Sequence, residues 1–214
     1  EIPEKGLVKW AKPVGVVAAI TPSTNPQATP VNKAMMAIKG GNAIIIAPPP
    51  AAWDATEPAV AGMRAELSRI GLPADLVQML PNPVTREMTT RLMEMSDLVV
   101  ATGSQANVKA AYKSGKPALG VGLGNAPVII DSSADLASAA DLIMQSKTFD
   151  NATSCSSENA VVIVDDIYDA AIKALEKHGG YMADPAERSR IVDRLWIDSK
   201  LNRAVIAQGP ERLV

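Results

Sequence analysis

Short apolar runs that alternate with helix-like segments constrain the fold of this chain more than any other feature of its sequence. Residues 14–20 and 43–47 are uninterrupted apolar runs, which is typical of strands buried on both faces of a parallel sheet. The segment between them carries apolar residues at helical spacing and ends at Gly40-Gly41. Because this strand–helix pair recurs four times before residue 118, we predict an α/β fold with a doubly wound, mainly parallel sheet.

The other expected elements follow from the same apolar patterns and from residues that start helices. Asp54 and Glu57 have capping-box spacing, and Asn82-Pro83 has the features of a helix start. We expect further strands at 76–80, 97–101, 118–123, 127–130 and 159–164, and further helices at 54–70, 82–95, 104–114, 135–149, 166–177 and from Asp184 onward.

The regular alternation of short apolar runs and helix-like segments changes after residue 126. Beyond that point the strand-like runs are fewer, and longer helical and polar segments separate them. We therefore divide the chain into one α/β domain at residues 1–126 and the beginning of a second α/β domain at residues 127–214. Because the chain starts at Glu1 and stops at Val214 without a closing element, we expect a fragment of a longer protein.

Composition excludes several classes of protein. Hydrophobic residues make up 47% of the 214 residues and charged residues 21%, which excludes disorder as the dominant state. A net charge of -2 gives no basic surface, so we expect no nucleic-acid partner. The apolar runs are far shorter than the roughly 18 residues that span a bilayer, so we expect no membrane segment. A single cysteine allows no internal disulfide and no cysteine-rich zinc site, so we expect no metal and a reducing, cytoplasmic location.

Cys155 lies in a run of hydroxyl residues, Thr153-Ser154-Cys155-Ser156-Ser157, within a polar loop between a helix and a strand. A free cysteine is often a small buried hydrophobe, although such a cysteine more often has apolar neighbours. A loop cysteine acts as a nucleophile where its thiolate is stabilised. The residues alone leave both interpretations open.

Polar or glycine-rich segments follow several of the predicted strands. Residues 21–26 (TPSTNP) can offer donors to a developing oxyanion or form a rigid turn. Residues 102–104 (TGS) open a helix whose backbone N–H groups can hold a phosphate. Residues 120–124 are rich in glycine, which can also reflect tight packing, and no Gly-x-Gly-x-x-Gly fingerprint is present. His178 lies at a helix end, where it indicates a C-terminal cap rather than a catalyst.

Five segments in order along the chain resemble the aldehyde dehydrogenase family, and in particular its CoA-acylating branch of acetaldehyde, propionaldehyde and sulfoacetaldehyde dehydrogenases. They are PVGVVAAITPSTNP (13–26), KGGNAIIIAPPP (39–50), ATGS (101–104), GVGLGNAPVIID (120–131) and KTFDNATSCSSENAVVIV (147–164).

This resemblance implies that residues 1–126 form a Rossmann-like nicotinamide dinucleotide-binding domain and that residues 127–214 begin the catalytic domain. It also implies oxidation of a small aldehyde with NAD or NADP, and with coenzyme A as co-substrate, by a homo-oligomer whose full chain is longer than this one. Cys155 would be the nucleophile, and the side chain of Thr24 or Asn25 would help to stabilise the oxyanion. The implied cofactor-binding residues are Thr21, Pro22, Ala47, Pro48, Thr102, Gly103, Ser104 and Gly122.

Departures from the family's hydrolytic members point to the acyl acceptor. Those members carry a Glu in the glycine-rich strand that activates water, and Val121 stands at that place here. Without the base, a thioester on Cys155 can wait for another thiol, which favours CoA. Hydrolytic members also have a Lys and a Glu at the positions of Ala47 and Pro50, and the loss of the carboxylate leaves both NAD and NADP open.

Functions other than that of an acylating enzyme are also compatible with the sequence. Glu158 follows Cys155 by three residues and can in principle serve water in a hydrolytic aldehyde dehydrogenase. The chain can also be a non-catalytic nucleotide-binding module, or inert as a separate fragment, with Cys155 in a structural role.

Overall fold

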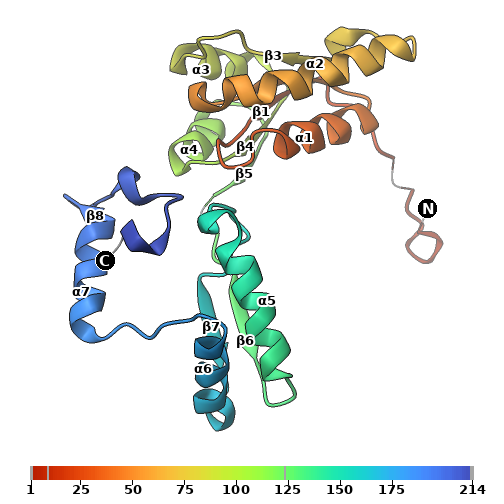
Figure 1. Ribbon diagram of the computed structural model, residues 1–214. Helices are drawn as coiled ribbons and strands as arrows, with labels where there is room; N and C mark the ends of the chain where they lie inside the picture. Colours follow the sequence, from red (N-terminus) through yellow and green to blue (C-terminus); the bar gives the residue numbers. More distant parts are fainter. Residues whose placement is uncertain (1, 9, 123, 213–214) are drawn as a thin grey trace. The chain divides into compact units, whose positions relative to one another are not determined.

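The computed structural model describes residues 2–8, 10–122 and 124–212. The chain divides into two compact units, Glu1–Leu123 and Gly124–Val214 (Figure 1). This division falls three residues before the expected boundary at 126/127. None of the helices in the described ranges is long and apolar enough to cross a membrane. The same ranges contain no group of three or more His, Cys, Asp or Glu side chains that could hold a metal ion.

The first unit is built on a five-stranded sheet in which every neighbouring pair of strands is parallel. The strand order is β3-β2-β1-β4-β5. The strands are β1 (Val16–Ile20), β2 (Ala43–Ala47), β3 (Val77–Met79), β4 (Leu98–Thr102) and β5 (Ala118–Val121). The parallel sheet is thus confirmed, and every strand end lies within two residues of the expected position. The expected run 118–123 ends at Leu123, which lies outside the described residues.

In the described part of the first unit, four helices cover the two faces of this sheet (Figure 1). The contacts of alternate β1 side chains identify the face on which each helix lies. Val17 and Ala19 pack with side chains of the first two helices, whereas Ala18 and Ile20 pack with side chains of the last two. A strand buried on both faces explains why its sequence is continuously apolar. The doubly wound arrangement is therefore confirmed. The helices are α1 (Ala28–Lys39), α2 (Trp53–Arg69), α3 (Arg86–Met95) and α4 (Gln105–Lys113).

One predicted helix start and one predicted helix cap are wrong. Helix α3 begins at Arg86 and not at Asn82-Pro83, because the side chain of Thr85 accepts a hydrogen bond from the backbone N–H of Met88 and caps the helix. Helix α2 begins at Trp53, directly after a 3-10 turn, and no side chain caps it. The capping box expected from Asp54 and Glu57 is therefore not formed.

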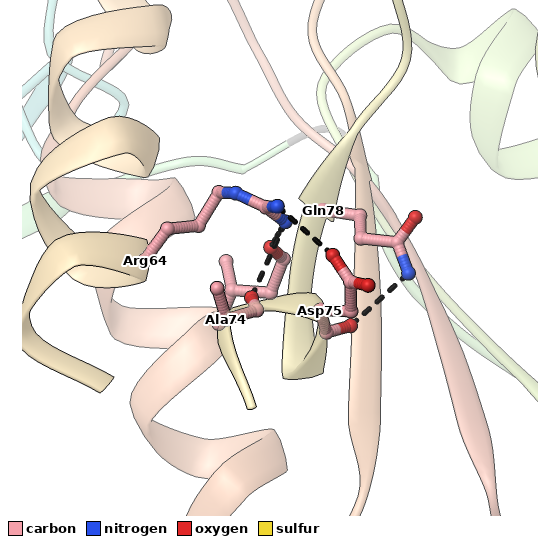
Figure 2. Close-up of polar contacts among 5 residues, drawn as sticks. Arg64, Ala74, Asp75 and Gln78 are labelled. Carbon is pink, nitrogen blue, oxygen red and sulfur yellow. Dashed lines mark hydrogen bonds and ion pairs between the residues drawn. The ribbon is translucent and has the colours of Figure 1, made fainter. Parts of the chain in front are cut away.

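A partly exposed network around Arg64 ties α2 to the edge of the sheet (Figure 2). The Arg64 guanidinium donates to the carbonyl oxygens of Ala74 (3.2 Å) and Val77 (2.7 Å), at the 3-10 turn before β3 and in β3 itself. It also pairs with the Asp75 carboxylate at 2.9 Å. The Gln78 side chain donates to the Asp75 carbonyl at 3.0 Å. Through these contacts a single side chain fixes the short strand that supports β2.

The second unit contains a parallel pair of strands, three helices and a short antiparallel hairpin. The strands are β6 (Pro127–Ile130), β7 (Ala160–Ile163), β8 (Trp196–Ile197) and β9 (Lys200–Leu201), and the helices are α5 (Leu136–Thr148), α6 (Tyr168–Lys177) and α7 (Pro185–Leu195). Asp184 and Glu187 form the capping box of α7. His178 ends α6, and its Nδ1 lies 2.8 Å from the Ala174 carbonyl oxygen, so its predicted role as a cap is confirmed.

Short 3-10 turns also occur in the described residues. They are Pro3–Lys5, Pro50–Ala52, Ala74–Leu76, Phe149–Ala152, Asp165–Ile167, Arg203–Val205 and Pro210–Arg212.

Candidate cofactor cavity and nucleophile loop

The chain reverses its winding direction between β1 and β4, which are neighbours in the sheet. In open α/β sheets, ligands bind outside the carboxyl ends of the strands at this kind of switch point. Thr21-Pro22 follows β1, and Gly103 follows β4 with a φ of +133°. A Cβ atom on Gly103 would lie 3.6 Å from the Pro22 backbone, so the two loops run close together. The hydroxyl of Ser104 accepts from the N–H of Asn107 and caps α4 beside them.

A cavity of about 450 Å³ opens at the carboxyl ends of β1 and β2. Thr21 and the prolines after β2 form one wall, and α3 and α4 form the others. The structure thus brings together three of the predicted cofactor residues, Thr21, Ala47 and Pro48. Sequence reasoning missed the α3 wall, which contributes Thr85, Arg86, Thr89, Thr90 and Met93. The misplaced start of α3 hid these residues, although Thr85 three residues before Met88 had the spacing of a cap.

The Thr21 side chain gives this cavity the character of a ligand site. The residue is 2% exposed, and its Oγ1 has no hydrogen-bond partner among the described residues. A buried hydroxyl without a partner costs free energy, so native proteins seldom keep one without a reason. A nucleotide with many polar atoms, bound in the cavity, would supply the missing partner. The residues present therefore fit a nicotinamide dinucleotide.

A second groove, of about 650 Å³, lies between α1 and the strands β4 and β5. Asn25, Thr102 and Val121 line it together, whereas Thr24 is exposed elsewhere on the same loop. Sequence reasoning missed Lys33, which lines the groove from α1. Burial lowers the pKa of Lys33 from 10.5 to about 8. Its place within the apolar spacing of α1 was the signal that could have indicated its partial burial.

The glycines at and after β5 have a packing role. A Cβ atom at Gly120 would lie 2.6 Å from Val108 Cγ1, and one at Gly122 would lie 2.5 Å from Gln105 Nε2. Both neighbours belong to α4, so the glycines let this helix approach the strand closely. Packing therefore explains Gly120, whereas at Gly122 the flexible end of the Gln105 side chain could move aside; cofactor binding by Gly122 stays a prediction.

Cys155 lies in the second unit on the loop between α5 and β7, and it is exposed. The loop is held by its own hydroxyl groups. Thr153 Oγ1 donates to the Asp150 carbonyl at 2.6 Å, and the Ser154 and Ser156 hydroxyls lie 2.8 Å apart. A hollow of about 430 Å³ beside the cysteine is lined by these serines and by Phe149. In contrast to a core cysteine, this thiol is open to a reactant.

Glu158 is the carboxylate nearest to Cys155 in the sequence. Its own backbone N–H and the Ser146 hydroxyl hold the pKa of the Glu158 carboxyl below its usual value, with Lys147 contributing. A carboxylate stabilised in its ionised form is a weaker base. The Oε2 atom of Glu158 is nevertheless buried without a hydrogen-bond partner among the described residues, so these contacts do not decide between a structural role and activation of water.

Comparison with known proteins agrees with this geometry. Residues 3–183 match the model of the aldehyde dehydrogenase family. The acylating sulfoacetaldehyde dehydrogenase of Cupriavidus necator is 52% identical over 208 residues, which are 97% of this chain and 42% of that protein.

Solved structures give the same result. An acetylating aldehyde dehydrogenase from Geobacillus thermoglucosidasius superposes with a TM-score of 0.87 at 40% identity, over 95% of this chain and 45% of that one. A Rhodopseudomonas palustris propionaldehyde dehydrogenase with bound CoA and an acylated cysteine superposes with a TM-score of 0.78 at 34% identity, over 87% of this chain and 43% of that one. This chain thus spans less than half the length of these relatives. It belongs to the aldehyde dehydrogenase family.

Proposed function

We propose that the complete protein is a CoA-acylating aldehyde dehydrogenase, which converts an aldehyde, CoA and NAD(P)⁺ into acyl-CoA, NAD(P)H and a proton. The observation that carries this proposal is the exposed Cys155 on a hydroxyl-rich loop, in a chain that has Val121 where hydrolytic relatives have a base. The names of the relatives, acylating and acetylating, support the same activity.

In the proposed reaction, the Cys155 thiolate attacks the carbonyl carbon of the aldehyde and forms a carbon–sulfur bond. The backbone N–H of Cys155 and the side chain of Asn25 or Thr24 stabilise the resulting oxyanion. Of these two side chains, Asn25 is favoured because it lines the groove with Thr102 and Val121. When bound, NAD(P)⁺ accepts the hydride that leaves the substrate carbon, so that an acyl thioester remains on Cys155. The CoA thiol then gives up its proton, attacks the thioester and displaces the Cys155 thiolate.

We propose that the cofactor lies in the cavity at the ends of β1 and β2. Thr21, Ala47 and Pro48 line that cavity, and the unpartnered Thr21 hydroxyl supports binding of a polar ligand there. The start of α4 at Ser104 offers backbone N–H groups and a positive dipole end to the diphosphate. Pro22, Thr102 and Gly103 shape the adjoining loops.

We propose that CoA is the acyl acceptor because neither of the two positions considered for a base, Val121 and Glu158, favours activation of water. Val121 is apolar, and the contacts of Glu158 weaken its carboxylate as a base. The acylated cysteine and bound CoA of the Rhodopseudomonas palustris relative show that a related protein forms such an intermediate. We further propose that the complete protein works in the cytoplasm as a homo-oligomer, in keeping with the free cysteine of this chain and with the family it belongs to.

Replacement of Cys155 tests the proposal. Cys155→Ala in the full-length protein should abolish aldehyde-dependent NAD(P)H formation, while the dissociation constant of NAD(P)H, measured by fluorescence, stays within about twofold. The matched control, Ser156→Ala on the same loop, should keep most of the activity. Retention of more than a few per cent of the activity by Cys155→Ala would show that the nucleophile is another residue.

A further inference from the structure

We propose that Thr56 is a positioning residue for aldehyde oxidation, because its buried hydroxyl fixes the loop that carries Thr24 and Asn25. This inference rests on the proposed function, in which one of these two side chains stabilises the oxyanion. It adds to that function a residue on another element, the helix α2. Thr56 lines neither the cavity at the strand ends nor the groove beside α1, so it acts through the loop that it holds.

The Thr56 hydroxyl reaches the end of this loop from 30 residues further along the chain. Its Oγ1 donates to the carbonyl oxygen of Pro26 at 2.8 Å, and it also lies 2.9 Å from the carbonyl oxygen of Ala52. The contact with Ala52 is the local one that a threonine in a helix commonly makes to the carbonyl four residues before it. The contact with Pro26 is not local, and it joins α2 to the loop directly after Asn25.

The place of Thr56 on α2 explains why a hydroxyl stands there. The buried residues of α2 are Thr56, Val60 and Leu67, and the other two belong to the apolar core. Thr56 is 0% exposed, and a hydroxyl on such a face costs free energy unless it is hydrogen-bonded. An apolar residue would avoid this cost, so the hydroxyl is explained by the contact that it makes.

The loop has little else to hold it in place. In the described part of the chain, the bond from Thr56 is the only hydrogen bond made to the backbone of residues 22–26. No side chain caps α1, which begins directly after the loop. Few rotations separate the held carbonyl from the Asn25 side chain, because proline fixes its own φ and restricts the residue before it. Loss of the Thr56 hydroxyl would therefore let Asn25 shift.

The size of the effect follows from the strength of an oxyanion contact. Removal of one donor from an oxyanion site costs roughly 10² to 10³ in rate. Loss of the Thr56 hydroxyl leaves the donor present but displaced, so we expect a smaller loss, of about 10-fold. The loss should be confined to the step that forms the oxyanion, because the loop of Cys155 is held by hydroxyl groups of its own.

Two rates measured on the full-length protein test this inference. The first is the burst of NAD(P)H without CoA, with whichever of acetaldehyde, propionaldehyde and sulfoacetaldehyde the wild type oxidises fastest. This step passes through the oxyanion. The second is alkylation of Cys155 by iodoacetamide, which reports the thiolate and its access but forms no oxyanion. A merely structural role of Thr56 would not change one rate without the other.

Two pairs of side chains at position 56 differ mainly by the hydroxyl. Thr56→Val should slow the burst by about 10-fold relative to the wild type, and Thr56→Ala should slow it similarly relative to Thr56→Ser. Thr56→Ser should stay within about threefold of the wild type, because it keeps the donor. Alkylation should stay within about twofold in all of them. The control, Ser96→Ala, removes a buried hydroxyl that donates to the Met93 carbonyl at the end of α3, and should change neither rate.

The results separate this inference from the proposed function. A burst that does not depend on the hydroxyl in either pair would overturn the inference, as would equal slowing of burst and alkylation. If one of the two pairs does not fold, the other decides. Failure of the proposed function would appear instead as the absence of acyl-CoA when CoA is added to the wild type, a step that the burst does not include.

Discussion

Lys33 is partly buried, at a cost in stability that can be measured. It lies in the middle of α1 and lines the groove with Asn25 and Val121, and no carboxylate of the described residues forms an ion pair with it. Burial lowers its pKa from 10.5 to about 8. At neutral pH the folded protein therefore holds a positive charge where its surroundings favour the neutral amine.

The sign of the effect on stability follows from proton binding. Below pH 8 the amine is charged in both the folded and the unfolded chain, so the full cost of burial is present. Between about pH 8 and 10.5 the unfolded chain binds more protons, so the free energy of unfolding rises with pH. A pKa difference of this size corresponds to about 3 kcal/mol at full burial. Because part of the side chain still contacts water, we expect about 1–2 kcal/mol.

Lys33→Met should remove this cost while it keeps the length of the side chain. We expect the variant to be about 1–2 kcal/mol more stable than the wild type at pH 7, with the difference largely gone at pH 10. Urea denaturation at both pH values, followed by circular dichroism, measures the change. The control, Lys39→Met, alters an exposed lysine in the last turn of the same helix and should show no such gain. Equal stability of Lys33→Met and wild type at pH 7 would refute the reasoning.

Three further predictions concern the sheet edge, the cavity and the acyl acceptor. Arg64→Met should lower the free energy of unfolding by about 1–3 kcal/mol in the urea assay, because it leaves two carbonyl oxygens without their donor. The control, Arg69→Met, breaks only a surface ion pair and should change the free energy of unfolding by less than about 0.5 kcal/mol. Thr21→Val should raise the stability of the ligand-free protein by about 1 kcal/mol, since it removes an unpartnered hydroxyl. The same variant should weaken cofactor binding, as measured by calorimetry. A loss of stability would mean that the hydroxyl has a partner. Val121→Glu should increase the release of carboxylic acid in the absence of CoA, by up to about 10² to 10⁴, as followed by a product assay; a folded variant without any gain would separate this position from the choice of acceptor.

The sequence predicted the sheet of the first unit well because its strands are buried on both faces. The apolar run at 43–47 has the same bounds in the structure, and Ser104 starts α4 as expected. The start of α3 was misplaced because proline and the Thr85 cap compete as start signals, and a hydrogen bond of the Thr85 hydroxyl decides between them. The capping box expected at Asp54 does not form for a similar reason, since the 3-10 turn Pro50–Ala52 leads directly into α2 at Trp53.

The candidate site was predicted less completely. Thr21, Ala47 and Pro48, which the family resemblance implied as cofactor contacts, line one cavity because the ends of their strands meet at one edge of the sheet; their contact with a cofactor stays a prediction. Arg86 and Lys33 were missed because helical residues reach a cavity only through packing of their helices on the sheet, and local spacing does not show which face of a helix borders the site. Gly120 illustrates the converse, since a glycine in a motif with a functional appearance is explained by its close packing against Val108 and Tyr112 of α4.

The most direct test of the acyl-enzyme is to trap it and then discharge it. The full-length protein is mixed with aldehyde and NAD(P)⁺ in the absence of CoA and quenched with acid, and the tryptic peptide 148–173, which contains Cys155 as its single cysteine, is weighed by mass spectrometry. The proposed mechanism predicts that this peptide carries one acyl group, that the group persists in water, and that added CoA removes it as acyl-CoA. An unmodified Cys155 during turnover, or release of free acid as fast without CoA as acyl-CoA forms with it, would contradict the account.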